Sequence, residues 1–219
     1  MDDRVREAYR HCEALVRAYD KDRYLASLFA PVDRRRHLLA LYAFALEIGR
    51  VKAAVTQPMT GVIRLQWWLE AVTGLRAGEA AASPVMIALQ DAALQTNLSL
   101  VPLAAAVEAR QAELGGSPPT GARAVVLAMA ARLLGAGDDG ITAAAESGAQ
   151  AMSFVASEPH HAREAYIAFC DKIDKAPQQA LPAFLPVALV PLRLKNPDAP
   201  QWRRQITLLR AAWFGFPRI

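Results

Sequence analysis

The most informative segment of the chain is Tyr42-Ala43-Phe44-Ala45-Leu46-Glu47-Ile48-Gly49-Arg50-Val51-Lys52-Ala53. It belongs to a longer segment, from Asp33 to about Val55, in which apolar residues recur every three or four positions. This spacing is typical of one face of an α-helix. The residues on that face are Leu38, Leu41, Tyr42, Ala45, Ile48 and Val51. We therefore predict a long helix, capped by Asp33, that packs one apolar face against the rest of the molecule.

Composition and periodicity extend the helical prediction to the whole chain. Of the 219 residues, 53% are hydrophobic and 21% are charged, which suits a protein with a substantial core. Alanine and leucine dominate, and no segment shows the alternation of a strand. Loops are expected at 78–84 and 135–140. Helices are expected at about 3–30, 33–55, 62–75, 85–98, 102–114, 123–134, 141–156, 163–175, 181–194 and 202–214. Within the first of these ranges, Asp22 is expected to cap a short second helix that begins at Arg23. We predict a single all-α domain over residues 1–219, a bundle of roughly nine or ten helices.

The cysteines and the N-terminus predict a cytoplasmic protein. Cys12 and Cys170 lack the spacing of a metal site or a disulfide framework. The N-terminus, Met1-Asp2-Asp3-Arg4, is charged and precedes no apolar stretch, so we expect no secretory signal. The longest apolar run, Ala183 to Leu192, is shorter than the ~20 residues that span a bilayer.

The charge pattern excludes one class of partner. The formal net charge is +4, and the densest basic clusters are Arg34-Arg35-Arg36 and Arg203-Arg204. Solvated helix faces explain such clusters, and contact with a phosphate or an anionic membrane is the alternative. No nucleic-acid-binding motif accompanies them, so we expect no nucleic-acid partner.

Three motifs stand in order between Asp22 and Val72. They are Asp22-Arg23-Tyr24-Leu25-Ala26-Ser27-Leu28-Phe29-Ala30-Pro31, Leu41-Tyr42-Ala43-Phe44, and Ile63-Arg64-Leu65-Gln66-Trp67-Trp68. In this order and spacing they resemble the squalene/phytoene synthase family, with weaker matches at 148–150, 158–163, 182–186 and 208–213. The resemblance implies a terpenoid-synthase-like helical bundle. We expect the bundle to be shortened, because the chain lacks several tens of residues of the family pattern between Arg163 and Pro182.

The resemblance also implies a reaction and a metal site. The family condenses two prenyl diphosphates, and two facing aspartate clusters hold Mg²⁺ ions that neutralise the leaving diphosphate. The first cluster falls on Gly49, Arg50 and Ala53, and the second on Ser157 and His161. None of these five residues is a carboxylate. We therefore expect two degenerate motifs, no catalytic residue and no bound cofactor, with Mg²⁺ only if the chain is an enzyme after all.

Within the family, the chain is most similar to the branch that includes the mitochondrial complex I assembly factor. The shared features are the run from Glu47 to Lys52, the helix with Arg64 to Trp68, and Pro159-His160-His161. This implies a pseudoenzyme that binds a protein partner, or a prenyl or lipid ligand, during respiratory complex I assembly, with peripheral contact to the inner membrane. The alternative is a squalene/phytoene-type prenyltransferase, completed by a partner subunit.

Residues of the matched motifs are candidates to line a ligand cavity. They are Arg23, Tyr24, Tyr42, Phe44, Arg64, Trp67 and Trp68. Arg23 could bind a phosphate bidentately, or be an exposed arginine beside a capping aspartate. Trp67 and Trp68 are adjacent on a helix, so their side chains diverge by about 100°. We expect one tryptophan in the core and the other in a groove or interface.

Overall fold

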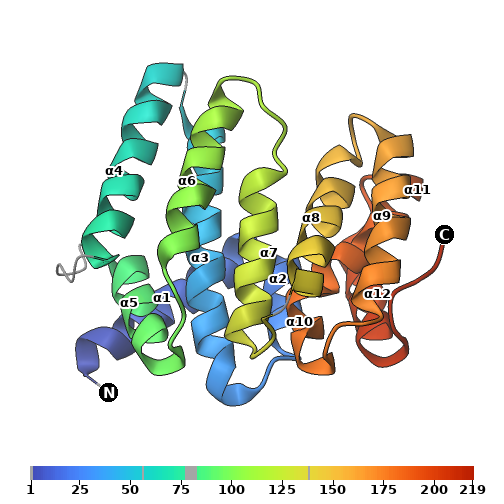
Figure 1. The fold of residues 1–219 in the computed structure, drawn as a ribbon, viewed down its shortest axis with the longest axis horizontal. Coiled ribbons are helices and arrows are strands. Elements are labelled where there is room, and N and C mark those ends of the chain that lie inside the picture. Colours follow the sequence, from blue (N-terminus) through green and yellow to red (C-terminus); the bar gives the residue numbers. More distant parts are fainter. Residues whose placement is uncertain (1, 56, 77–82, 138) are drawn as a thin grey trace.

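The computed structural model describes residues 2–55, 57–76, 83–137 and 139–219. Most of the loop predicted at 78–84, and position 138 of the loop predicted at 135–140, lie outside these ranges. Within them all regular structure is helical, as predicted (Figure 1). The elements are α1 (Asp3–Tyr19), α2 (Lys21–Ser27), α3 (Val32–Ala54), α4 (Pro58–Arg76), α5 (Pro84–Thr96), α6 (Val101–Leu114), α7 (Gly121–Leu133), α8 (Asp139–Phe154), α9 (Pro159–Ile173), α10 (Leu181–Phe184), α11 (Val190–Lys195) and α12 (Gln201–Phe214), with 3₁₀ turns η1 (Gln178–Ala180) and η2 (Leu185–Leu189).

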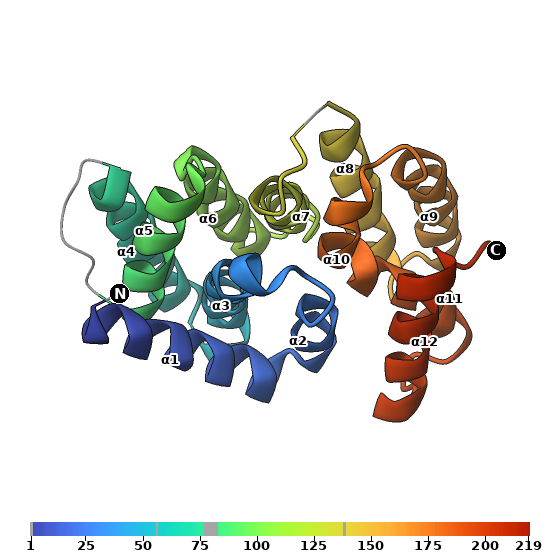
Figure 2. The ribbon, with the colours of Figure 1, turned by 90° about the horizontal axis from the view of Figure 1, so that it is seen from below.

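Helix α3 lies at the centre of the N-terminal part of the molecule. It contacts α1, α2, α4, α5, α6 and α7. Figure 2 shows α6 on one side of α3 and α1 on the other. From α6 onward, α7, α8 and α9 follow one another in a row, each packed on its predecessor (Figures 1 and 2). The two ends of the chain lie at opposite ends of the molecule.

The central helix is more deeply enclosed than its periodicity predicts. Every residue from His37 to Ala45 is buried, so this half of α3 is covered on all sides. Beyond Ala45 only Ile48 and Val51 are buried, and the one-sided pattern holds there. The predicted cap is also wrong: α3 begins after Pro31 without a side-chain cap, and Asp33 instead pairs with Arg34 at 3.5 Å.

Other helix boundaries also differ from the prediction, including the starts of α4 at Pro58 and of α9 at Pro159. Asp20, and not Asp22, caps α2, because its carboxylate accepts a hydrogen bond from the backbone N–H of Arg23 at 3.0 Å. The helix predicted over 181–194 is divided into α10, η2 and α11. Pro182, Pro186 and Pro191 lie at the starts of these pieces, where a missing backbone N–H costs least.

The C-terminal segment folds back on the core. Phe216 lies edge-on to Phe169, with ring centroids 5.0 Å apart, and Tyr166 donates a hydrogen bond to the carbonyl of Pro217 at 2.9 Å. A small apolar cluster joins α2, η2 and α12 through Ala26, Leu185, Ala188, Leu189, Leu208 and Ala211. Among the described helices, none has the length and apolarity needed to cross a membrane.

Candidate functional site

Gly49 and Arg50, two positions of the first degenerate motif, line a cavity of about 300 Å³. Side chains from six helices converge on it, together with the α1–α2 junction and η2. The lining is dominated by guanidinium groups. The residues are Asp20, Asp22, Arg23, Ala45, Leu46, Gly49, Arg50, Arg110, Arg123, Met152, Pro186 and Arg193.

The side chain of Arg110 lies next to Gly49, on the side where a Cβ atom would point. A Cβ atom built on Gly49 would lie 3.6 Å from Nη2 of Arg110. Arg110 in turn donates from Nη1 to Oε2 of Glu113 at 2.6 Å, and these side chains are only 15% and 7% exposed. Lys52 donates to the backbone carbonyl of Glu113 at 2.9 Å, which ties α3 to the end of α6. A positive charge thus lies where the family pattern places a metal-binding carboxylate.

Arg23 and Tyr42, both predicted ligand residues, meet at the edge of the cavity. The Arg23 guanidinium carbon lies 5.3 Å from the centroid of the Tyr42 ring. Arg23 also donates from Nη1 to Oδ2 of Asp20 at 3.3 Å. The Tyr42 hydroxyl is buried and has no hydrogen-bond partner among the described residues. Burial raises the pKa of Tyr42, so this phenol stays neutral.

Arg123 reaches the cavity with a neutral hydrogen-bond partner. Its Nη1 donates to Oγ of Ser153 at 3.0 Å, and Ser153 donates to the carbonyl of Pro119 at 3.0 Å. In the described part of the chain, Arg123 forms no ion pair with a carboxylate. Burial, and then the neighbouring Arg23 and Arg110, lower the pKa of Arg123 to about 10. Arg123 still carries its charge at neutral pH.

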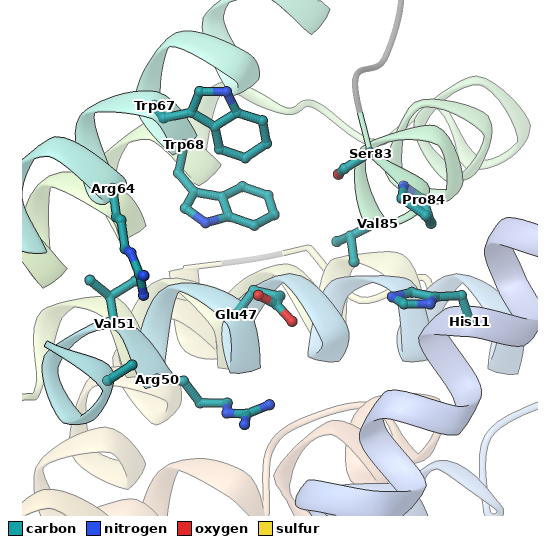
Figure 3. A pocket seen from close by; sticks show the side chains of 11 residues that line it. His11, Glu47, Arg50, Val51, Arg64, Trp67, Trp68, Ser83, Pro84 and Val85 are labelled. Carbon is teal, nitrogen blue, oxygen red and sulfur yellow. The ribbon is translucent and has the colours of Figure 1, made fainter.

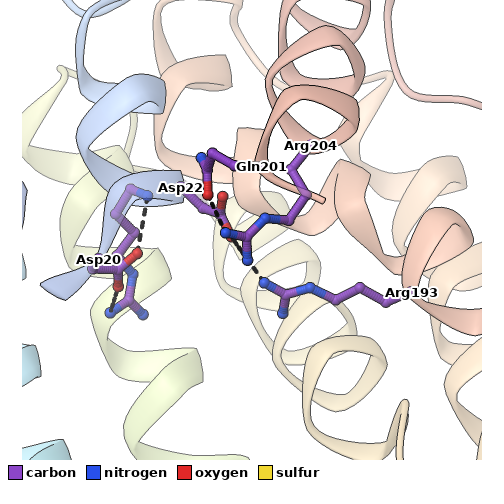
Figure 4. A network of polar contacts seen from close by, with 6 residues as sticks. Asp20, Asp22, Arg193, Gln201 and Arg204 are labelled. Carbon is purple, nitrogen blue, oxygen red and sulfur yellow. Dashed lines mark hydrogen bonds and ion pairs between the residues drawn. The ribbon is translucent and has the colours of Figure 1, made fainter. Parts of the chain in front are cut away.

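Asp22 is already committed to a structural network. Its Oδ2 lies 2.9 Å from Nη2 of Arg193 and 3.3 Å from Nη1 of Arg204, while Arg204 also donates to Gln201 (Figure 4). Figure 4 shows these side chains reaching toward Asp22 from the C-terminal helices. Asp20 is occupied as the cap of α2. Both aspartates that line the cavity therefore have structural partners: Asp20 caps α2, and Asp22 pairs with two arginines.

These residues do not fit a magnesium site. Mg²⁺ requires oxygen ligands, usually one or two carboxylates free to coordinate. Gly49 and Arg50 supply none, and Ala53 is exposed outside the cavity. No group of three or more His, Cys, Asp or Glu residues among those described could hold a metal ion. The arginines in the same cavity would repel a divalent cation.

The second degenerate motif lies away from this cavity. Ser157 lies in the turn between α8 and α9, His161 lies in the first turn of α9, and both are exposed. The His161 ring packs edge-on against Phe154, with centroids 4.7 Å apart. Helix α8 instead faces the cavity with Met152 and contacts Arg123 through Ser153. The structure therefore does not bring Ser157 and His161 together with Gly49 and Arg50.

A second cavity, of about 600 Å³, holds the tryptophan pair (Figure 3). Trp68 is 8% exposed and lies edge-on to Phe44 at 5.6 Å, whereas Trp67 is 44% exposed. One ring belongs to the core and the other lines the groove, as their helical offset predicts. Arg64, Glu47 and Arg50 contribute charged groups, and the remaining walls are His11, Val51, Ala54, Ser83, Pro84 and Val85.

Arg50 is the link between the two cavities. It lines both of them, and its guanidinium lies over the ring of Tyr19, 4.1 Å from the centroid. Tyr24, by contrast, lines neither; its hydroxyl faces Glu13 at 3.5 Å and Arg17 lies over its ring.

Sequence reasoning missed the arginines that complete the cavity, Arg110, Arg123 and Arg193. One signal was available, because Arg110 and Arg123 are among the few charged residues of two alanine-rich helices. Such a charge is expensive to bury unless it meets a partner or a ligand. Their convergence on Gly49 depends on the packing of α6 and α7 beside α3, which local periodicity does not encode.

Comparison with known structures agrees with the fold. A crystal structure of a dehydrosqualene synthase in complex with ligand superposes with a TM-score of 0.71 at 12% sequence identity. The match covers 94% of this chain and 95% of that chain. At this low identity the match shows a shared terpenoid-synthase-like fold.

Three similar curated proteins are all described as complex I assembly factor 6 or its homolog. The chain is 33% identical over 104 residues to NADH dehydrogenase (ubiquinone) complex I, assembly factor 6 of Homo sapiens, which is 48% of this chain and 31% of that protein. It is 34% identical over 92 residues to the Mus musculus protein, covering 42% and 28%. The Drosophila melanogaster homolog is 36% identical over 64 residues, covering 29% and 19%. The matched segments span less than a third of these relatives. The family model for squalene/phytoene synthase matches residues 16–156, and the chain therefore belongs to the squalene/phytoene synthase family.

Proposed function

We propose that this chain is a non-catalytic member of its family that acts in the assembly of respiratory complex I by binding a protein partner. The curated relatives named for complex I assembly support this context. The observation that carries the non-catalytic part is the position of Arg110. Its guanidinium lies where a side chain at Gly49 would point, so the first aspartate position is both empty of carboxylate and electrostatically reversed.

Physical chemistry connects this reversal to the loss of the reaction. Ionising a prenyl diphosphate requires the leaving group to be neutralised as it departs. Metal ions held by carboxylates provide concentrated charge on that group. Here Asp20 caps a helix and Asp22 holds two arginines, so neither is free to bind metal. We propose that the protein works without a metal cofactor and keeps the scaffold for binding.

We further propose that the exposed face of α12 makes the peripheral contact with the inner membrane. Trp202, Ile206, Leu209, Trp213 and Phe214 are all more than 40% exposed on it. Arg203 and Arg210 are exposed beside them, and α12 contains no acidic residue. Aromatic side chains beside arginines suit the boundary of an anionic lipid surface.

Vesicle flotation tests the α12 contact. We expect the protein to float with vesicles containing phosphatidylglycerol and not with neutral phosphatidylcholine vesicles. The double variant Trp213→Ser, Phe214→Ser should stay in solution, while the matched change Met59→Ser on α4, also exposed, should float as the parent does. Equal flotation of all three proteins would contradict the assignment of this face.

Gene deletion tests the role in assembly. We expect loss of NADH:quinone oxidoreductase activity and accumulation of subassemblies on native gels, restored by the wild-type gene. Fully assembled, active complex I in the deletion strain would sink this part of the proposal.

Turnover tests the non-catalytic part separately. Purified protein incubated with farnesyl or geranylgeranyl diphosphate and Mg²⁺ should release no diphosphate and form no condensed product. Product formation that EDTA abolishes would show that the chain is a metal-dependent prenyltransferase.

A further inference from the structure

We infer that a groove beside α12 binds one anionic phospholipid, with an acyl chain along its apolar lining and the head-group phosphate against an arginine. The inference rests on the proposed membrane contact of α12 and adds a defined lipid site to it. The groove has a volume of about 450 Å³ and lies between α12, α11 and the chain that follows α12. Figure 2 shows these segments together at the C-terminal end of the molecule. The lining residues are Leu192, Trp202, Arg203, Ile206, Thr207, Arg210, Ala211, Phe214, Gly215, Phe216 and Pro217.

One wall of the groove is held in place by helix α9. Gly215 ends α12 with a φ of +83°, a backbone conformation that glycine adopts most readily, and the chain turns back there. Phe216 then packs edge-on against Phe169, with ring centroids 5.0 Å apart. The carbonyl of Pro217 accepts a hydrogen bond from Tyr166 at 2.9 Å. The groove is therefore preformed, which lowers the entropy cost of binding a ligand in it.

The lining suits a hydrocarbon chain better than a peptide. Most of its side chains are aliphatic or aromatic. The one hydroxyl among them, on Thr207, already donates to the carbonyl of Arg203 at 2.9 Å. An extended peptide needs partners for its backbone N–H and C=O groups, and this lining supplies few of them. An α-helix is about 10 to 12 Å across with its side chains, so it would rest on the rim of the groove.

Two arginines give the groove a positive charge. Arg203 and Arg210 line it, and none of the described lining residues is acidic. In the described part of the chain, neither arginine forms an ion pair with a carboxylate. The guanidinium carbon of Arg203 lies 5.2 Å from the centroid of the Trp202 ring, a contact that leaves the N–H groups at its edge able to donate. A free guanidinium binds phosphate oxygens bidentately, so the groove favours an anionic head group.

The two arginines mark different levels of the groove. They are seven positions apart on α12, which corresponds to two helical turns and about 10 Å along the axis. A phosphate bound by one of them leaves the apolar lining between them for the acyl chain. Replacing each arginine separately therefore shows which of the two binds the head group.

The groove and the outer face of α12 use different side chains. Leu209 and Trp213 are 43% and 73% exposed on this helix, and neither lines the groove. Thr207 and Phe216 line the groove and are half-buried. Binding of one lipid and adsorption to a membrane surface can therefore be separated by mutation.

Calorimetric titration of the full chain tests the site. The probes are dihexanoyl phosphatidylglycerol and dihexanoyl phosphatidylcholine, each below its micelle concentration and at constant ionic strength. We expect one molecule of the phosphatidylglycerol to bind per chain, with a dissociation constant at least about tenfold lower than that of the phosphatidylcholine. The two probes share their acyl chains, so the difference measures the contribution of the net charge of the head group.

Variants of the groove make the test specific. Thr207→Trp fills the groove with a large side chain and should abolish binding of both lipids. Arg203→Gln or Arg210→Gln, both at exposed positions, should weaken binding of the phosphatidylglycerol about tenfold. The matched control Arg163→Gln, exposed on α9, should leave binding unchanged.

Three titration results would overturn the site: no binding below the micelle concentration, equal affinity for the two lipids, or unchanged affinity in Thr207→Trp. Sedimentation velocity tests a different occupant. A dimer of the wild-type chain that Thr207→Trp dissociates would overturn the lipid site and make the groove an interface between two copies.

A second double variant separates this inference from the proposed membrane contact. Leu209→Ser, Trp213→Ser should stop flotation with vesicles and keep binding of one lipid in the groove. A wild-type chain that binds one lipid and does not float would reject the membrane contact and support the groove. A chain that floats without binding one lipid would reject the groove and support the membrane contact.

Discussion

Asp22 and Arg193 are separated by 171 positions in the sequence, yet Oδ2 of Asp22 accepts a hydrogen bond from Nη2 of Arg193 at 2.9 Å. Arg204 approaches the same oxygen at 3.3 Å. One carboxylate, 11% exposed, therefore joins α2 to both α11 and α12. This contact fastens the C-terminal helices to the N-terminal part of the molecule beside the arginine-lined cavity.

Asp22→Asn should destabilise the protein. The change removes the negative charge and leaves Arg193 and Arg204 facing each other with little compensation. Breaking such a largely buried pair costs about 2 to 3 kcal/mol after allowance for its partial exposure. Urea unfolding followed by circular dichroism measures the difference. The control is Asp33→Asn, which removes the 76% exposed partner of Arg34 and should change stability by less than about 1 kcal/mol. Equal effects in the two variants would contradict the role of Asp22.

Gly49→Asp should restore a carboxylate without restoring a metal site. There is room for a Cβ atom, and the new carboxylate would meet Arg110. We expect the free energy of unfolding to rise by about 0.5 to 1 kcal/mol, through the ion pair and the loss of a helical glycine. Thermal unfolding with and without MgCl₂ should give the same midpoint. The control Ala53→Asp, at an exposed position, should give no gain. Stabilisation of Gly49→Asp by Mg²⁺ would refute this prediction.

His37 should make stability depend on pH. It is 3% exposed, its Nδ1 lies 2.8 Å from the hydroxyl of Tyr9, and Tyr9 donates to Asp91 at 2.8 Å. Arg36 donates from Nε to Nε2 of His37 at 3.4 Å, so a proton on Nε2 would face a guanidinium. Burial, and then Arg36, lower the pKa of His37 to about 4.

The sign follows from proton linkage. The unfolded chain binds a proton at His37 near pH 6.5, and the folded protein does so only near pH 4. Stability from this group is therefore full above pH 6.5 and falls as the pH drops toward 4, by about 2 kcal/mol at pH 5. Urea unfolding between pH 7 and 5 should show this slope. His37→Gln should flatten it, and the exposed-site control His160→Gln should not. An unchanged slope in His37→Gln would exclude His37 as its source.

Neighbouring tryptophans should respond very differently to the same substitution. Trp68→Ala removes a buried ring that packs on Phe44 and should cost about 3 to 5 kcal/mol. Trp67→Ala removes a ring that is 44% exposed and should cost clearly less, about 1 kcal/mol. Denaturant unfolding of the pair, each the control for the other, measures the contrast. Similar losses would mean that Trp67 also belongs to the core.

Local sequence rules predicted the helices well and their ends less well. The helix predicted over residues 33–55 and the divergence of Trp67 and Trp68 both follow from local helical geometry, and the structure agrees on both. Asp22 was the predicted cap of α2, but the carboxylate that caps this helix is that of Asp20. Only the packing of α11 and α12 distinguishes them, since it gives Asp22 two arginines and leaves Asp20 to the helix.

Sequence reasoning predicted only part of the candidate site, because the rest depends on how the helices pack. Gly49, Arg50 and Arg23 were named because the family pattern runs through them, and all three line one cavity. Arg110, Arg123 and Arg193 were not, because they reach it from separate helices brought together by tertiary packing. The periodicity of α3 predicted one buried face, so it did not predict that every residue from 37 to 45 is buried.

The guanidinium beside Gly49 also bears on how this chain could change over evolutionary time. A single mutation that returned aspartate to α3 would meet Arg110, and its charge would be neutralised before any metal could use it. A mutation of Arg110 alone would leave Glu113 without its partner. We expect neither step to provide a metal site by itself, because each leaves one charge of the Arg110–Glu113 pair or of the new aspartate already in use. Under the proposed loss of catalysis, this arrangement would act as a ratchet that keeps the lineage from regaining the reaction.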